Sequence, residues 1–201
     1  MSGHSPTGQL LAVLEEAREL GFLGPGAVEP HLSHADGFRQ AWEGTPPTAA
    51  VDLGSGGGVP ALPLALAWGE TRWLLVEANG RRARFLRRAV RSLGIDGRVS
   101  VREERAEVLG RDAGARGSHD AVVARGFGPP AVTAECAAPF LTVGGRLLTS
   151  EPPDRRPWPA EALAELGLAP LGRHGSVMVL EQARLCPDRF PRRAPAKHPL
   201  F

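Results

Sequence analysis

Residues 51–60 read Val-Asp-Leu-Gly-Ser-Gly-Gly-Gly-Val-Pro, and this stretch decides the fold class. It begins within residues 49–53, which are expected to form a strand, and it leads into an apolar helical pattern at 60–68. Glycine lets the backbone turn sharply and approach a ligand closely. A strand that runs through a glycine-rich turn into a helix is typical of nucleotide-binding α/β folds.

The spacing of these glycines excludes two common nucleotide sites. The dinucleotide fingerprint requires glycine at its first, third and sixth positions; Gly54 and Gly56 match, but the sixth residue is Val59. A phosphate-binding P-loop requires a lysine, and this stretch has none. With an acidic residue two positions before the first glycine, the pattern instead fits a nucleoside cofactor without a pyrophosphate, notably S-adenosyl-L-methionine; a purely structural turn is the alternative. The expected cofactor-binding residues in this stretch are Asp52, Gly54, Ser55, Gly56 and Gly58.

Strand and helix patterns alternate outward from this stretch. Apolar, two-sided strands separated by helices predict a parallel sheet covered on both faces, and right-handed crossovers then give a doubly wound α/β fold. We expect an N-terminal helical region at 1–44 and one domain at 45–201, which ends in a C-terminal antiparallel hairpin and a basic, Pro/Arg-rich tail at 187–201. The expected strands are 49–53, 73–76, 99–101, 120–124, 145–149, 168–171 and 177–181, and the expected helices are 9–20, 32–42, 60–68, 81–93, 130–140 and 159–166.

Polar residues follow three further strands at the sheet edge where doubly wound folds bind ligands. Glu77 ends the second strand and can accept hydrogen bonds from both ribose hydroxyls, as an acidic residue there does in dinucleotide sites. Ala106 and Glu107 follow the third strand, where an adenine edge would lie. Arg125 follows the fourth strand and is expected to orient substrate or cofactor. The alternative for each is an ordinary surface residue.

The composition is that of an ordinary globular chain, with 201 residues, 42% hydrophobic and 23% charged. Lys197 is the only lysine beside 23 arginines, and nine arginines lie between Arg81 and Arg105 against three acidic residues. Such a cluster indicates a nucleic-acid footprint or, equally, a solvated helix face. Two cysteines cannot build a disulfide framework or a four-cysteine zinc site, so no metal is expected. No targeting or membrane-spanning pattern is seen, so a cytoplasmic protein without a membrane partner is expected.

Several separate segments together resemble one family. They are 52–60 (DLGSGGGVP), 81–86 (RRARFL), 105–107 (RAE), 120–125 (DAVVAR), and 190–193 (FPRR) with 195–200 (PAKHPL); His31-Leu32 with Asp36 resembles the segment before the first strand. These pieces resemble the RsmG (GidB) family of 16S ribosomal RNA guanine-N7 methyltransferases. The glycine turn alone would suit many methyltransferases, whereas its proline and the Pro-Arg and Pro-Ala-Lys tail are more specific.

The resemblance implies a class I S-adenosylmethionine-dependent methyltransferase fold, with ribosomal RNA or the small ribosomal subunit as partner. It also implies a cofactor contact at Val59, a residue that the positions of the strand ends do not indicate. Guanine N7 carries no proton, so methyl transfer to it needs alignment and no general base. The expected substrate-binding residues are Phe127, which could stack on a base or equally belong to the core, and the tail cations Arg192, Arg193 and Lys197.

The chain departs from the family pattern on the substrate side. No Trp-Asn or Asn-Leu-Thr signature precedes His31, and Thr149-Ser150-Glu151 stands where the family often has Lys-Gly. A carboxylate there would repel a phosphate backbone. Two alternatives therefore stay open: a small-molecule methyltransferase that kept the cofactor site and lost RNA contacts, and a non-enzymatic RNA-binding or assembly protein.

Overall fold

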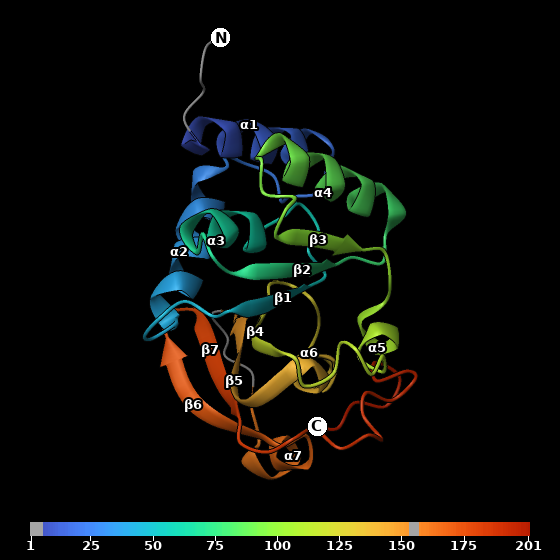
Figure 1. Cartoon of the computed structure of the whole chain (residues 1–201). Helices are drawn as coiled ribbons and strands as arrows, with labels where there is room; N and C mark the ends of the chain where they lie inside the picture. The colour runs from blue at the N-terminus through green and yellow to red at the C-terminus, as the bar shows by residue number, and fades with distance from the viewer. Residues whose placement is uncertain (1–5, 153–156) are drawn as a thin grey trace.

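One seven-stranded sheet organises the chain (Figure 1), and the computed structural model describes residues 6–152 and 157–201 of it. The strands lie in the order β3-β2-β1-β4-β5-β7-β6. Chain order reverses between β1 and β4, so the sheet is doubly wound about that point. The strands are β1 (Ala49–Leu53), β2 (Arg72–Val76), β3 (Val99–Arg102), β4 (His119–Ala124), β5 (Leu141–Ser150), β6 (Leu168–His174) and β7 (Val177–Gln182).

Six strands run in one direction, and only β7 runs the other way. The β1–β2, β1–β4, β2–β3 and β4–β5 ladders are parallel, whereas β7 pairs antiparallel with both β5 and β6. The predicted fold class, including the C-terminal antiparallel hairpin, is confirmed. Strand alternation explains how one sheet serves two cores: Ala121 and Val123 of β4 face one cluster, and Val122 and Ala124 face the other.

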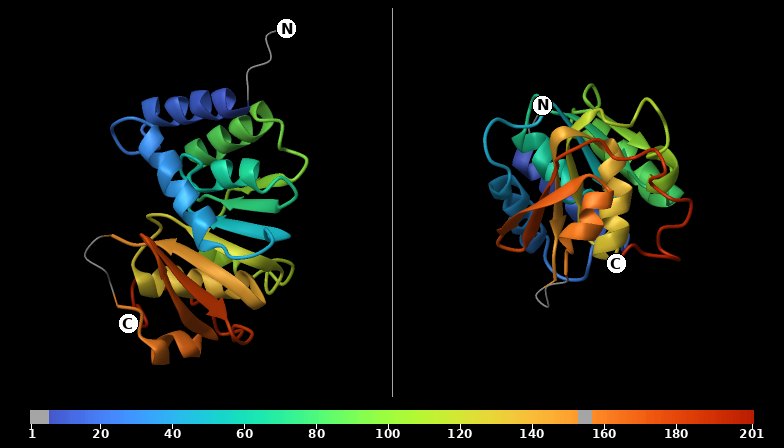
Figure 2. Two further views of the ribbon diagram at one scale, coloured as in Figure 1. Left: turned by 90° about the vertical axis from the view of Figure 1, so that its left-hand side faces the viewer. Right: turned by 90° about the horizontal axis from the view of Figure 1, so that it is seen from below.

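Helices cover both faces of the sheet (Figures 1 and 2). The helices α1 (Pro6–Glu19), α2 (Glu29–Ala41), α3 (Ala61–Ala67) and α4 (Gly80–Ser92) contribute to one core cluster, together with Ala50, Leu75 and Val179 of the sheet. The other cluster takes residues from α5, α6, a short 3-10 segment and α7. These elements are α5 (Ala106–Leu109), α6 (Pro130–Ala137), η1 (Ala138–Phe140) and α7 (Ala160–Glu165).

Three differences from the expected elements stand out, and the first has a local cause. The predicted helix 130–140 ends at Ala137, and Pro139 lies in the 3-10 turn that follows, because proline cannot continue an α-helix in its interior. The strand expected at 145–149 extends to Leu141–Ser150, and its ladder with β4 has a register shift between His119 and Ala121. The four-residue helix α5 was not predicted.

The two N-terminal helices are packed into the body of the protein. Leu14 and Phe38 are fully buried and belong to the same cluster as the sheet residues. The boundary expected near residue 45 stays a prediction. In residues 6–152 and 157–201, none of the helices combines the length and apolar character needed to span a bilayer.

Candidate functional site

The glycine-rich turn after β1 has the backbone shape that only glycine adopts readily. Gly54, Gly56 and Gly58 have φ angles of +67°, +53° and +91°. The amide N–H groups of Gly54 and Ser55 donate to the carbonyl oxygen of Val76 at 2.8 and 3.1 Å, which ties the turn to the end of β2. A Cβ atom at Gly54 would lie 2.9 Å from the Phe127 ring, so both the angle and the close approach require glycine.

Glu77 connects this turn to the start of α4. Its side chain is buried, its Oε2 accepts from the Gly56 N–H at 2.9 Å, and its Oε1 accepts from the Asn79 N–H at 2.8 Å. Asn79 in turn caps α4 by accepting from the Arg81 and Arg82 amides. Each carboxylate oxygen keeps a second acceptor position, so the proposed contact with ribose hydroxyls is compatible with these bonds.

A cavity of about 610 Å³ opens beyond the carboxyl ends of β1, β2, β3 and β4, within the size range of small-molecule and cofactor sites. Of the residues predicted from sequence, it brings together Gly54, Glu77, Ala106, Glu107, Phe127, Arg193 and Lys197. Cys136, expected in the core, is 1% exposed and also contributes to the wall. The lining therefore joins four strand ends to the C-terminal tail.

Asp52 lies behind this turn, in the interior of β1. Its side chain is 1% exposed, and among the residues that the structure describes its Oδ2 has no hydrogen-bond partner. Burial raises the pKa of Asp52 to about 7, and the nearby Arg125 opposes that rise. A buried carboxyl group with an unused oxygen, two residues before the cavity-lining Gly54, suits a cationic ligand. The residues present therefore fit S-adenosylmethionine, which carries a sulfonium and an ammonium group.

Six of the predicted cofactor residues are absent from the cavity lining, namely Asp52, Ser55, Gly56, Gly58, Val59 and Arg125. Ser55 is 1% exposed and donates its hydroxyl to the Asp52 backbone oxygen at 3.1 Å. Val59 is buried in the core cluster with α1–α4, and Gly58 packs against Leu62. These positions shape the turn from behind, and a direct contact with the cofactor stays a prediction for each.

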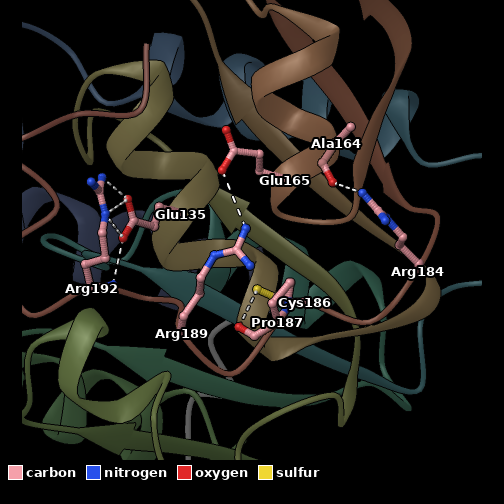
Figure 3. Close-up of polar contacts among 8 residues, drawn as sticks. All are labelled: Glu135, Ala164, Glu165, Arg184, Cys186, Pro187, Arg189 and Arg192. Atoms are coloured by element: carbon pink, nitrogen blue, oxygen red, sulfur yellow. Dashed lines mark hydrogen bonds and ion pairs between the residues drawn. The ribbon is translucent and has the colours of Figure 1, made fainter.

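Arg192 is held by a carboxylate of the protein itself (Figure 3). Glu135 on α6 is fully buried and accepts from the Arg192 backbone N–H at 2.7 Å, from its Nε at 2.9 Å and from its Nη2 at 2.6 Å. Arg192 is absent from the lining of the cavity that its neighbour Arg193 lines. Its predicted role in substrate binding is untested, but its evident role is to anchor the tail.

Further contacts fasten the same tail to the body of the protein. The Arg116 guanidinium donates to the carbonyl oxygens of Phe190 at 2.7 Å and Cys186 at 2.9 Å. Arg189 forms an ion pair with Glu165 of α7 at 3.5 Å (Figure 3). The residues from Arg193 to Lys197 thus reach the cofactor cavity from an anchored segment.

A second cavity, of about 660 Å³, contains Arg125. Arg125 Nη1 lies 3.0 Å from His31 Nδ1, and His34, one helical turn further along α2, also lines this cavity. Burial, and then the neighbouring Arg125, lowers the pKa of both histidines. Arg125 lines this second cavity and is absent from the lining of the first. His34 was not predicted as a site residue from the sequence; its signal was a pair of histidines three residues apart on one helix.

Glu151 also lines the second cavity, but its charge is compensated. Arg173 of β6 forms an ion pair with this carboxylate, and the Trp158 Nε1–H donates to it at 2.5 Å. The side chain of Glu151 is only 5% exposed. The repulsion of phosphate expected from this residue is therefore weakened by a partner that lies 22 residues away in sequence.

The comparison with known families agrees with this geometry. Residues 35–151 match the GidB family model, described as rRNA small subunit methyltransferase G. A ribosomal RNA small subunit methyltransferase G from Chloroflexus aggregans is 34% identical over 86% of this chain and 78% of its own length.

The chain belongs to the GidB family. A second relative with the same name, from Rubrobacter xylanophilus, is 36% identical over 75% of the chain, and the match spans 64% of that relative's length. The family is one of methyltransferases, and the resemblance inferred from the sequence motifs is confirmed.

Solved structures show the fold of this GidB-family chain. A putative O-methyltransferase from Klebsiella pneumoniae superposes with a TM-score of 0.62 at 17% identity, over 90% of both chains. TYW2 from P. horikoshii, solved in complex with MeSAdo, has a TM-score of 0.55 at 18% identity over 79% of this chain and 61% of its own. Within the described part of the chain, no cluster of three or more His, Cys, Asp or Glu residues could hold a metal ion.

Proposed function

We propose that this chain transfers a methyl group from S-adenosyl-L-methionine to N7 of a guanine in small-subunit ribosomal RNA. One observation carries the cofactor assignment: the glycine turn, Glu77 and the Ala106-Glu107 pair converge on one cavity at the switch point of a methyltransferase fold. Membership of the GidB family supports the RNA substrate. Such a substrate would place the activity in the cytoplasm.

Each cofactor residue has a distinct part in this proposal. Glu77 would accept hydrogen bonds from the ribose hydroxyls, and Ala106 with Glu107 would lie at the adenine edge. Asp52 would stabilise the positive charge of the ligand from behind the turn. When bound, the cofactor supplies an electrophilic methyl group on sulfur.

Residues of the chain would align the acceptor and exclude water. Guanine N7 has a lone pair and no proton, so the reaction needs no general base. Arg125 would orient the acceptor, the half-buried Phe127 would stack on a base, and the tail cations Arg193 and Lys197 would contact the RNA backbone or the cofactor cavity.

The raised pKa of Asp52 predicts a pH-dependent affinity for the cofactor. Below about pH 7 the carboxyl group of the free protein is protonated and neutral, and above it the group is ionised and attracts a cation. S-adenosylmethionine affinity should therefore rise between pH 6 and 8, and binding near pH 7 should release a proton. Calorimetry in buffers of different ionisation enthalpy measures both quantities.

The Asp52→Asn variant is the matched control for this pH profile. Ionisation of the ligand itself is common to both proteins, so the difference between the two profiles reports Asp52. The same raised pKa means that the free wild-type protein loses stability as pH rises from about 4 to 7, since the folded state holds a proton that the unfolded state releases. Identical pH profiles for wild type and variant would contradict this assignment.

The function itself is tested by modified-nucleoside analysis. Small ribosomal subunits from a strain that lacks the gene should contain one N7-methylguanosine fewer, and purified protein with S-adenosylmethionine should restore it. Mass spectrometry of nuclease fragments locates the nucleotide. Cofactor binding without methylation of these subunits would favour the small-molecule alternative, and the absence of cofactor binding would favour the non-enzymatic one.

A further inference from the structure

The second cavity shares a wall with the cofactor cavity. Gly126, Phe127, Gly128 and Pro129 line both, and these residues directly follow Arg125 at the end of β4. A molecule in the second cavity would therefore share this loop with the methyl donor. This is the position that an acceptor requires, because methyl transfer needs the reacting atoms about 3–3.5 Å apart and in line.

Arg125 presents hydrogen-bond donors in this cavity. A guanidinium carries five N–H groups, and the hydrogen bond to His31 Nδ1 uses one of them. Among residues 6–152 and 157–201, no carboxylate lies within ion-pair distance of Arg125. Glu151, a carboxylate that also lines the cavity, is paired with Arg173. Arg125 is thus the group that would bind an acceptor oxygen.

The remaining walls suit a flat, uncharged group. The imidazole rings of His31 and His34 line the cavity from α2, and Phe127 lines it from the shared loop. His34 Nε2 is buried and has no hydrogen-bond partner among the described residues, so the ring retains unused polar capacity. Aromatic rings beside one guanidinium favour a nucleobase with a carbonyl group.

We propose that the second cavity receives the acceptor guanine, with Arg125 donating to O6 and His31 acting as the positioning residue that holds Arg125. This inference rests on the proposed function. Arginine commonly contacts both O6 and N7 of guanine, but here N7 must keep its lone pair for the methyl group, so O6 is the atom left for Arg125. Adenine carries an amino group at the same place. Its N–H donors would face the N–H donors of Arg125, and no acceptor would lie between them.

A binding experiment tests the cavity without any enzyme activity. Protein with ¹⁵N-labelled histidine is saturated with S-adenosylhomocysteine and titrated with GMP or AMP, and the ring signals are followed by NMR; the variants His31→Asn and His34→Asn assign two of them. We expect GMP to move the signals of His31 and His34, to leave that of the exposed His174 in place, and to bind at least about 10-fold more tightly than AMP. Equal affinity for both nucleotides would overturn the inference, and so would shifts confined to the signals of other histidines.

Kinetics with small ribosomal subunits test the positioning role. His31→Leu removes the acceptor for Arg125, whereas the side-chain oxygen of His31→Asn lies where Nδ1 does and can replace it. We expect the leucine variant to lose at least about 10-fold in kcat/KM for the subunits at unchanged cofactor affinity, and the asparagine variant to recover most of this loss. The control is His174→Leu, which should behave as wild type.

The outcomes separate the two proposals. If the wild-type protein binds GMP at His31 and His34 but methylates no ribosomal RNA, the proposed substrate is wrong, and the assignment of the second cavity to a guanine base holds. If it methylates the RNA and neither histidine responds to GMP or to substitution, the proposed function stands and this inference fails.

Discussion

Replacement of Glu77 by alanine should weaken S-adenosylmethionine binding by about 100-fold, a loss of about 2.7 kcal/mol. The carboxylate is buried and accepts from the Gly56 and Asn79 amides, so it holds the glycine turn and the start of α4 as well as facing the cofactor cavity. Its loss removes the charged acceptor for the ribose and leaves two backbone donors unpaired at once. Isothermal calorimetry measures the affinity.

Two further variants separate binding from folding. Glu77→Gln preserves the shape and one acceptor oxygen, so its affinity should fall between those of wild type and Glu77→Ala. Glu103→Ala removes a carboxylate that forms a surface ion pair with Arg87 and should bind the cofactor as wild type does. A folded Glu77→Ala protein with native affinity would refute the cofactor assignment for this residue.

Arg192→Ala should strongly destabilise the anchored tail. It leaves the fully buried Glu135 carboxylate without the guanidinium that donates to it through Nε and Nη2. Removing one partner of a buried ion pair costs about 3–5 kcal/mol; because 35% of the Arg192 side chain is exposed, we expect about 2–3 kcal/mol. The midpoint temperature of thermal unfolding should then fall by about 5–10 °C.

The same variant should also weaken cofactor binding, because the residues from Arg193 to Lys197 line the cavity and follow this anchor. The neighbouring variant Arg193→Ala is the matched control for stability. Because Arg193 is exposed, this variant should unfold at the same temperature as the wild-type protein. The double variant Arg192→Leu with Glu135→Leu removes the unpaired charge and should recover part of the stability. An unchanged unfolding temperature of the Arg192→Ala variant would show that the Arg192–Glu135 pair does not anchor the tail.

Much of the fold could be predicted because its signals are local. The strand at Ala49–Leu53 and the helix over Gly80–Ser92 follow from apolar runs, helical spacing and glycines that stop each element. The strand-end positions of Glu77, Ala106 and Glu107 follow from the rule that parallel strands present their carboxyl ends at one edge.

The partners of charged side chains could not be predicted in the same way. Arg192 was expected to hold substrate, yet it pairs with Glu135, 57 residues earlier in the sequence. Glu151 was expected to repel phosphate, yet Arg173 and Trp158 compensate it. No sequence period records which cation will meet which carboxylate, because long-range ion pairs depend on how distant elements pack.

The sequence by itself determined the doubly wound sheet, the glycine turn and the family, since these depend on local backbone preference and short motifs. Only the tertiary structure decided that α2 would place His31 and His34 beside Arg125 and that the tail would line the cofactor cavity. The physical reason is that side chains far apart in the chain become neighbours only when both faces of the sheet are covered.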